Sequence, residues 1–256
     1  MASSENVKIQ SVNRAIQILL CFENNEELGV TEIGKMVGLH KSTAFGLIST
    51  LEMSKILEKN ENSGKYRLGL ELFRLGTKVN SNLRHISIPY LEQLVKMYQE
   101  TVNLVLRDGN SVIYLEKVES SRSMRISTTV GGKLPLYCTA VGKAIMANLP
   151  QSELNNILSG MTFTKYTNNT LHDTNSILES LEKVRSNGYA EDVEELETGL
   201  SCVAAPIFNH FSSPFAAISV SGPTFRMTED FRKEISSALI QYTQEISGKL
   251  GYIKSL

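Results

Sequence analysis

The sequence predicts a two-part α+β protein, in which an N-terminal winged helix-turn-helix and a linker helix precede a larger mixed domain. Residues 30–51 contain two amphipathic helix patterns that Gly38-Leu39 separates. Two short alternating runs, 56–59 and 65–68, follow around a turn-rich segment, which is typical of a β-hairpin wing. From residue 84 onward, apolar runs of strand length alternate with helical patterns. We expect domains at 1–69, 70–83 and 84–256.

Composition describes a globular chain that is longer than one typical domain. The 256 residues are 41% hydrophobic and 21% charged, with a formal net charge of −1. The N-terminus is polar and no apolar run approaches the ~18 residues of a membrane span, so we expect neither a targeting segment nor a membrane partner. Cys21, Cys138 and Cys202 are not paired in spacing, which favours a reducing cytoplasm without disulfides. No Cys/His pair has zinc-like spacing, and we expect no cofactor.

The second helix of the helix-turn-helix presents a small, uncharged face away from its core. Its core positions recur at the spacing of a packed stripe: Ala44, Leu47, Ile48 and Leu51. Winding at about 100° per residue turns four others outward, namely Ser42, Phe45, Gly46 and Ser49. Such a face allows a helix to enter the major groove of DNA, where hydroxyls and an apolar ring can contact base edges. The alternative is an ordinary helical hairpin within some core.

The predicted wing carries three cations, Lys59, Lys65 and Arg67, whose simplest role is to neutralise DNA phosphates. Residues 1–82 hold ten Lys and Arg against nine Asp and Glu, which is weak for a nucleic-acid binder. Residues 41–67 hold five cations against three anions, so the positive charge is local. A solvated hairpin face is the alternative.

The periodicities predict the remaining elements. Helices are expected at 11–24, 70–83, 88–100, 139–149, 151–159, 174–187 and 228–250, and strands at 102–107, 112–118, 124–130, 203–208 and 215–221. The first two strands share a turn at residues 108–110, and the last two form a hairpin. An antiparallel sheet flanked by helices occurs in sensory domains and in enzymes, so the fold alone does not decide function.

Seven motifs carry a family resemblance: SVNRA (11–15), GLHKST (38–43), GKYRLG (64–69), TAVGKA (139–144), GYAED (188–192), GLSCVAAPI (199–207) and AISVSGP (217–223). Through them the chain resembles transcriptional regulators of the IclR family over nearly its whole length. The resemblance implies a GAF-like α+β effector-binding domain after the winged helix-turn-helix. It also implies a ligand-responsive regulator that binds double-stranded operator DNA as a homodimer or a dimer of dimers.

The outward face departs from the family, because Phe45-Gly46 stands where His-Arg or a similar polar pair is usual. The resemblance therefore does not define which operator sequence this chain binds. Glycine within a helix costs about 0.5–1 kcal/mol relative to alanine, and either close approach of DNA or drift at a tolerant position would explain it. The expected phosphate contacts are Lys41, Lys59, Lys65 and Arg67, the expected base contacts are Ser42, Thr43, Phe45 and Ser49, and Arg14 and Gly46 complete the DNA-binding set.

The second domain of the family binds a small effector, and eight positions of this chain resemble its pocket: Thr139, Ala140, Val141, Asp192, Leu200, Cys202, Ser219 and Ser221. The first three open a helix, whose free N–H groups and dipole form an anion site without Lys or Arg. Alternatively, Thr139 is an N-cap and nothing more. The expected ligand is a small organic acid with hydroxyl or keto groups, and an aromatic acid is the runner-up.

The remaining pocket positions have simple chemical roles. Ser219 and Ser221 share one strand face, a pattern that a solvent-exposed strand also shows. Asp192 can accept hydrogen bonds from ligand hydroxyls, while the other carboxylates of 191–197 are expected in a solvated loop. Leu200 and Cys202 supply an apolar wall.

Two enzyme hypotheses are weaker. Cys138 or Cys202 with His172-Asp173 would supply nucleophile, base and orienter, but no glycine-framed motif surrounds either cysteine. A phosphate-binding loop fails because Tyr137 and Ser127 stand where glycine is needed. A winged-helix adaptor that binds protein instead of DNA is the other alternative. We expect a cytoplasmic regulator that is not an enzyme, and a repressor rather than an activator.

Overall fold

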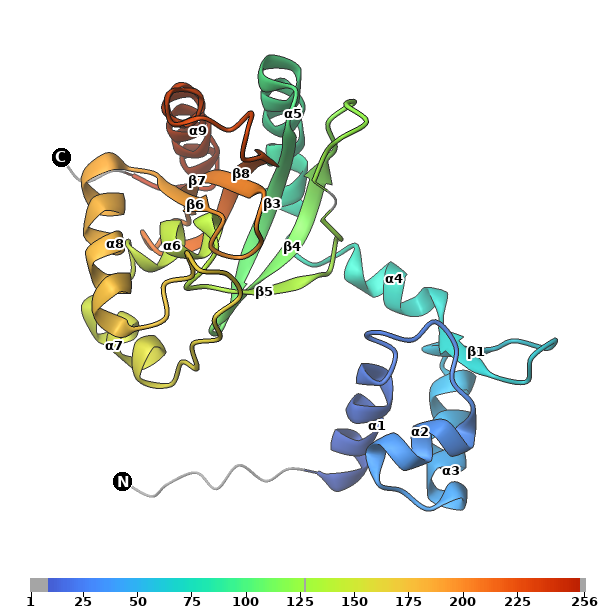
Figure 1. The fold of residues 1–256 in the computed structure, drawn as a ribbon. Helices are drawn as coiled ribbons and strands as arrows, with labels where there is room; N and C mark the ends of the chain where they lie inside the picture. Colours follow the sequence, from blue (N-terminus) through green and yellow to red (C-terminus); the bar gives the residue numbers. More distant parts are fainter. Residues whose placement is uncertain (1–8, 127, 254–256) are drawn as a thin grey trace. The chain divides into compact units, whose positions relative to one another are not determined.

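The computed structural model describes residues 9–126 and 128–253, and the chain divides into two compact units, Met1–Ser81 and Asn82–Leu256 (Figure 1). The polar N-terminus noted in the sequence lies outside the described residues except for Ile9 and Gln10. Each unit has a hydrophobic core of its own, as separately packed domains require. The domain limits expected from the sequence stay a prediction.

The N-terminal unit is a winged helix-turn-helix. Its elements are α1 (Gln10–Leu20), α2 (Val30–Val37), α3 (Lys41–Met53), β1 (Leu57–Lys59), β2 (Tyr66–Leu68) and α4 (Leu70–Gly76). Gly38 ends α2 with a left-handed φ of 67°, which confirms the predicted break before α3. Ile33, Ala44 and Ile48 are fully buried in the core of this unit. The two strands pair antiparallel, as the hairpin pattern predicted.

Two helices of this region differ from expectation. The helix predicted at 70–83 begins at Leu70 as expected but is shorter, because α4 ends at Gly76 and α5 (Ser81–Tyr98) begins after Asn80, whose φ is 45°. A residue in that left-handed conformation interrupts a right-handed helix. The first helix ends at Leu20 instead of residue 24, since the next amides bond three residues back and close a turn.

The C-terminal unit is built on a six-stranded antiparallel sheet with the strand order β5-β4-β3-β8-β7-β6. Its elements after α5 are β3 (Thr101–Asp108), β4 (Ser111–Val118), β5 (Lys133–Pro135), α6 (Ala140–Met146), α7 (Gln151–Ser159), α8 (Thr174–Asn187), β6 (Ala190–Val193), β7 (Leu200–Phe208), β8 (Pro214–Pro223) and α9 (Glu229–Lys249). Helices α5 and α9 cover one face of the sheet, and α6, α7 and α8 the other (Figure 1). Both faces of the sheet are therefore shielded from solvent.

The strand predicted at 124–130 is wrong, because residues 124–126 and 128–130 form a loop. Side chains bind the backbone of this loop in place of a neighbouring strand. Thr101 Oγ1 donates to the Ile126 carbonyl oxygen, and Lys117 Nζ donates to the Thr128 carbonyl oxygen. Sequence reasoning also missed β5 and β6, which are three and four residues long and hold too few alternations to be recognised.

The helix predicted at 88–100 begins earlier, since α5 starts at Ser81 and passes through Pro89. Proline lacks a main-chain N–H donor and is more often found in the first turn of a helix than in its interior. The sequence therefore predicted that this helix begins next to Pro89. Leu83, Leu91 and Leu94 are buried and hold α5 against the sheet on both sides of the proline. The remaining predicted helices and strands are confirmed within a few residues.

Candidate effector cavity and DNA-binding face

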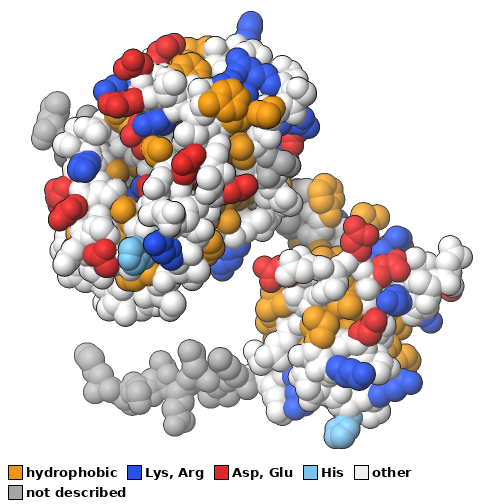
Figure 2. Space-filling view, viewed as in Figure 1, with side chains coloured by type: hydrophobic (Ala, Val, Ile, Leu, Met, Phe, Trp, Pro, Cys, Tyr) orange, Lys and Arg blue, Asp and Glu red, His pale blue; other side chains and the backbone are white. Residues whose placement is uncertain are grey.

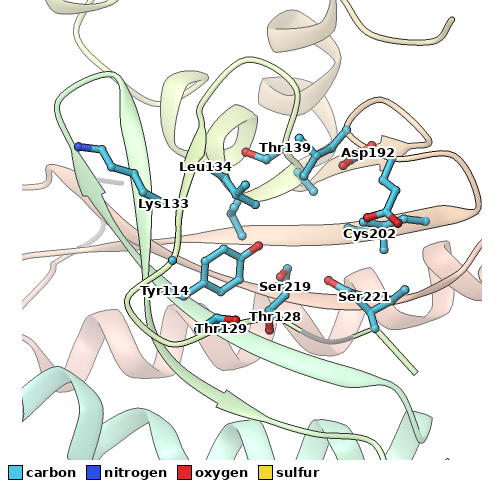
Figure 3. A pocket seen from close by; sticks show the side chains of 17 residues that line it. Tyr114, Thr128, Thr129, Lys133, Leu134, Thr139, Asp192, Cys202, Ser219 and Ser221 are labelled. Atoms are coloured by element: carbon cyan, nitrogen blue, oxygen red, sulfur yellow. The ribbon is translucent and has the colours of Figure 1, made fainter. Parts of the chain in front are cut away.

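A cavity of about 290 Å³ lies between the start of α6 and the sheet. All eight residues that sequence reasoning proposed for the effector line it: Thr139, Ala140, Val141, Asp192, Leu200, Cys202, Ser219 and Ser221. Figure 3 shows Tyr114, Ser219 and Ser221 around the interior, with Asp192 at one end and the Lys133 side chain pointing away at the other. The fold thus brings several separate motifs to one space.

Strand register aligns the polar residues of three strands. Asp192 on β6 pairs with Cys202 on β7, and Cys202 pairs with Ser221 on β8. Ser219 lies two residues before Ser221 on the same face, while the alternating apolar residues of β8 belong to the core on the opposite face. Both serines are only 3% exposed. The predicted polar and apolar faces are therefore confirmed, and the alternative of a solvent-exposed strand is excluded.

A buried asparagine, which sequence reasoning missed, organises the hydroxyl groups. Asn103 on β3 is fully buried, and its Nδ2 donates to Ser219 Oγ (3.5 Å) and Ser221 Oγ (3.3 Å). Its Oδ1 accepts from Thr128 Oγ1 at 2.6 Å. Because the serine oxygens act as acceptors here, each hydroxyl keeps its own hydrogen to donate to a ligand.

Thr139 is the N-cap of α6, as the alternative interpretation proposed. Its hydroxyl donates to the Pro135 carbonyl oxygen (2.9 Å) and accepts from the Gly142 N–H (3.2 Å). The N–H groups of Ala140 and Val141 lie in the first turn, where no carbonyl of α6 can accept them. Capping and anion binding are therefore compatible at this helix start, since they use different groups.

A buried ion pair joins α6 to the loop after β6. Lys143 is 2% and Glu195 is 8% exposed, and Lys143 Nζ donates to Glu195 Oε1. Glu195 Oε2 has no hydrogen-bond partner in the described part of the chain. The prediction that the carboxylates around Asp192 all lie in a solvated loop is therefore wrong for Glu195. The Lys143 ammonium supplies the partner that a buried carboxylate requires.

Asp192 is 1% exposed and lines the cavity from β6. Burial, reinforced by the negative charge of Glu195, raises the pKa of Asp192 to about 7. Its Oδ1 accepts from the Glu195 N–H at 2.7 Å, which orients the carboxyl group. Near neutral pH a large fraction of Asp192 is protonated and can donate a hydrogen bond to a ligand. Sequence reasoning assigned it the role of acceptor alone.

The wall opposite α6 was also missed from the sequence. Tyr114 of β4 lines it, together with residues of the loop that was predicted as a strand, Ile126, Thr128 and Thr129. Burial raises the pKa of Tyr114, so its hydroxyl stays protonated. Lys133 lines the rim, where its ammonium lies 2.7 Å from the Asp108 carboxylate and is half-exposed. The alternation of buried and less buried residues along β4 was the one sequence feature that could have indicated an inward-facing Tyr114.

The cysteines of the C-terminal unit do not form a catalytic arrangement. Cys138 and Cys202 are buried, and burial raises the pKa of both thiols, that of Cys138 to about 12. His172 Nδ1 lies 3.0 Å from a main-chain carbonyl oxygen, and the Asp173 carboxylate caps the N-terminus of α8. Across residues 9–126 and 128–253, no cluster of three or more His, Cys, Asp or Glu side chains could hold a metal.

In the N-terminal unit, the outward face of α3 is accessible. The predicted contact residues on α3 are exposed or, for the last, half-buried: Lys41, Ser42, Thr43, Phe45, Gly46 and Ser49. Lys41 and Phe45 line a shallow hollow with Lys59 and Gly64 of the wing. Figure 2 shows Lys and Arg side chains over the part of this unit that carries α3 in Figure 1. Helix and wing therefore form one cationic face, which we call the α3–wing face.

The cations of the α3–wing face differ in their surroundings. Lys65 lies 3.3 Å from Glu32, and Arg67 lies 3.2 Å from Glu58. Neither Lys41 nor Lys59 has an ion-pair partner among the described residues. Exposed pairs contribute about 0–1 kcal/mol, so a phosphate can compete with them. Arg14 is half-buried on α1 and does not line the hollow, and its contact with DNA stays a prediction.

Family models match both units. Residues 11–61 match the IclR helix-turn-helix domain, and residues 77–248 match the C-terminal domain of the bacterial transcriptional regulator IclR. The chain belongs to the IclR family. It is a ligand-responsive, DNA-binding transcriptional regulator, as its motifs implied.

Named relatives and a solved structure extend the match along the chain. The HTH-type transcriptional regulator XynR of Escherichia coli is 37% identical over 247 residues, 95% of this chain and 98% of XynR. The transcriptional repressor IclR of Escherichia coli is 32% identical over 245 residues, 94% of this chain and 89% of that protein. The crystal structure of Thermotoga maritima IclR is 34% identical with a TM-score of 0.77, covering 96% of this chain and 100% of that one.

None of the helices described for this IclR-family chain has the length and apolar character of a membrane span.

Replacing Asp192 with Asn should remove a pH dependence from the stability of the protein. The carboxyl pKa rises from 3.8 to about 7 on folding, so between these values the folded state binds a proton that the unfolded state releases. The neutral carboxyl therefore contributes stability below about pH 4 that is lost as the pH rises through about 7. In urea titrations, the free energy of unfolding of Asp192→Asn should rise by about 2–4 kcal/mol relative to the parent between about pH 4 and 8.

Asp108→Asn is the matched control, because it removes a carboxylate that is 55% exposed. Because an exposed ion pair contributes about 0–1 kcal/mol, the free energy of unfolding of this variant relative to the parent should vary by less than about 1 kcal/mol over the same range. A constant difference for Asp192→Asn as well would show that Asp192 ionises normally in the folded chain.

Proposed function

We propose that the cavity binds a small carboxylic acid bearing hydroxyl or keto groups, and that this effector controls the affinity of the winged helix-turn-helix for operator DNA. The supporting observation is the lining of the cavity, where eight positions from separate strands and one helix meet around about 290 Å³. This volume lies at the small end of ligand pockets, which favours a compact metabolite.

The carboxylate of the effector binds at the start of α6. The N–H groups of Ala140 and Val141 donate to it, and the protonated carboxyl group of Asp192 adds a third donor. Lys133 is paired with Asp108 at the rim, so the site works without a buried cation facing the ligand.

The hydroxyl or keto oxygens of the effector bind near β8. Ser219 and Ser221 each retain a hydrogen to donate, because Asn103 supplies the donor to their oxygens. The Tyr114 hydroxyl lies on the same cavity wall and adds a further donor. Leu200 and Cys202 provide the apolar side on which the carbon skeleton packs.

In the N-terminal unit, α3 enters the major groove and the wing contacts the backbone. Phosphates bind to Lys41, Lys59, Lys65 and Arg67, and bases contact Ser42, Thr43, Phe45 and Ser49, with Gly46 allowing close approach and Arg14 contributing from α1. In this division, the cations determine how tightly the protein binds any DNA, and the residues in the middle of α3 determine which base sequence it prefers.

Two copies of the chain bind one operator. A single recognition helix reads few base pairs, so paired half-sites should lie about one helical turn, or a multiple, apart. Helices α1 and α4 leave large apolar side chains uncovered within the N-terminal unit, among them Ile16, Leu20, Leu70 and Phe73. These residues suit contact with a second copy, and a dimer of dimers is the larger assembly.

The protein acts as a cytoplasmic repressor that its effector releases, and it is not an enzyme. The repressor IclR of Escherichia coli supports this direction of control. Effector and operator favour different arrangements of the helices that join the two units. Each ligand therefore weakens the binding of the other by the same factor.

Small acids should stabilise the protein in a manner that depends on Ser221. We expect pyruvate, D-gluconate or 4-hydroxybenzoate to raise the Tm, because a ligand that binds only the folded state stabilises it, while D-glucose, which lacks a carboxylate, has no effect. For the acid that binds, calorimetry should show about tenfold weaker affinity for Ser221→Ala, since a cavity hydrogen bond is lost. Operator affinity without the acid should not change.

Ser152→Ala is the control, because Ser152 is exposed on α7 and lies outside the cavity. Affinity of Ser221→Ala within twofold of the parent would contradict the pocket assignment, whatever the operator result.

Removing unpaired cations from the α3–wing face should change the salt dependence of DNA binding. Lys41→Ala and Lys59→Ala should each flatten the slope of log K against log salt by about one unit, because one phosphate contact is lost. Lys65→Ala should flatten it less, since Glu32 already neutralises part of its charge. Fluorescence anisotropy with a random duplex gives these slopes.

Lys183→Ala is the control, because Lys183 is exposed on α8 in the other unit. Slopes that match the parent for both Lys41→Ala and Lys59→Ala would show that another face binds DNA. Binding to a protein partner without any DNA binding would favour an adaptor instead.

A further inference from the structure

The exposed face of α3 lacks the side chains that bind purines through paired hydrogen bonds. Between Lys41 and Glu52 the helix contains no Arg, Lys, Asn or Gln. Those residues form the bidentate contacts with guanine and adenine in the major groove. The Thr50 hydroxyl donates to the Gly46 carbonyl oxygen at 2.9 Å, so it is already occupied within the helix. The middle of this face must therefore discriminate bases in another way.

Phe45 is an apolar side chain that the N-terminal unit leaves uncovered. It is 54% exposed and lies in the hollow that Lys41 and Lys59 also line. The two ammonium groups come from α3 and from the wing, and cations in such positions match the phosphates that border a groove. A ring that shares a hollow with phosphate-binding groups is placed to reach the edges of the bases. The surrounding charge thus favours DNA over an apolar protein surface as the occupant of this hollow.

Gly46 is not required by the packing of the chain. It is exposed in the interior of α3, and a Cβ built there would meet no heavy atom within 4 Å. Alanine favours helix formation over glycine, so the fold alone would gain from a side chain at this position. The packing of the chain therefore gives no reason for glycine, and the missing side chain leaves the helix backbone open to close approach by DNA next to the phenyl ring.

We propose that Phe45 and Gly46 together recognise thymine. The C5-methyl of thymine is the apolar group that bases present in the major groove, and it packs against the Phe45 ring. The missing side chain at Gly46 lets the base edge come close enough for that contact. This inference rests on the proposed entry of α3 into the major groove and adds the base that it prefers.

The test uses the full-length protein and the duplex that it enriches most from a randomised pool. Each thymine of a half-site is replaced in turn by deoxyuridine, which removes the methyl group and keeps the base pairing. For at least one thymine in each half-site, the parent should bind about fourfold more weakly after replacement, the effect expected for one buried methyl group. Phe45→Ala should bind the thymine and deoxyuridine duplexes alike.

Phe211→Ala is the matched control, because it removes a phenyl group that is 77% exposed in the C-terminal unit. It should discriminate thymine from deoxyuridine as the parent does. Gly46→Ala provides a second measurement: its Tm should rise with helix propensity, while its affinity for the enriched duplex falls about tenfold because the added Cβ meets the base edge.

Two results would overturn the inference and leave DNA binding intact. One is unchanged affinity after deoxyuridine replacement at every thymine of the enriched duplex. The other is Gly46→Ala binding that duplex as tightly as the parent. Failure of the protein to enrich any duplex would instead contradict the proposed operator binding itself.

Discussion

The cavity of the C-terminal unit depends on one buried ion pair. Lys143 of α6 and Glu195 of the loop after β6 are both nearly inaccessible, and each needs the other because an unpaired buried charge costs several kcal/mol. The pair holds α6 against the segment that carries Asp192. Next to this pair, α6 packs so closely against the segment after β5 that a Cβ at Gly142 would lie 2.1 Å from the Leu136 carbonyl oxygen. Both contacts fix where the helix start lies relative to the sheet.

This arrangement determines how the cavity can bind an anion. Lys143 is committed to Glu195, and Lys133 at the rim is committed to Asp108. The groups that remain are main-chain N–H groups, hydroxyls and a carboxyl group that burial keeps partly protonated near neutral pH. Such donors are directional, unlike an ammonium charge, so they favour a ligand whose oxygens match their positions. The buried ion pair thus favours selectivity over general anion binding.

The sequence predicted those elements whose signals are local. Helices α7 and α8 have the predicted bounds, because their apolar stripes and ends are encoded within a few turns. Residues 124–126 and 128–130 were wrongly predicted as a strand, because local periodicity does not show that side chains of distant strands bind this backbone. Family motifs identified eight cavity residues, yet two residues that hydrogen-bond to members of this set, Asn103 and Glu195, were missed. Glu195 is paired with a residue 52 positions away, and such a contact leaves no mark on local periodicity.

A double-mutant cycle on the buried pair tests the central claim most directly. Lys143→Met leaves the Glu195 carboxylate unpaired, and Glu195→Met leaves the ammonium unpaired, so each should lower the free energy of unfolding by about 3–5 kcal/mol. In the double variant no charge is stranded, and its stability in urea titrations should return to within about 1 kcal/mol of the parent. Single variants within about 0.5 kcal/mol of the parent, with additive effects in the double variant, would contradict the dependence of the cavity on this pair.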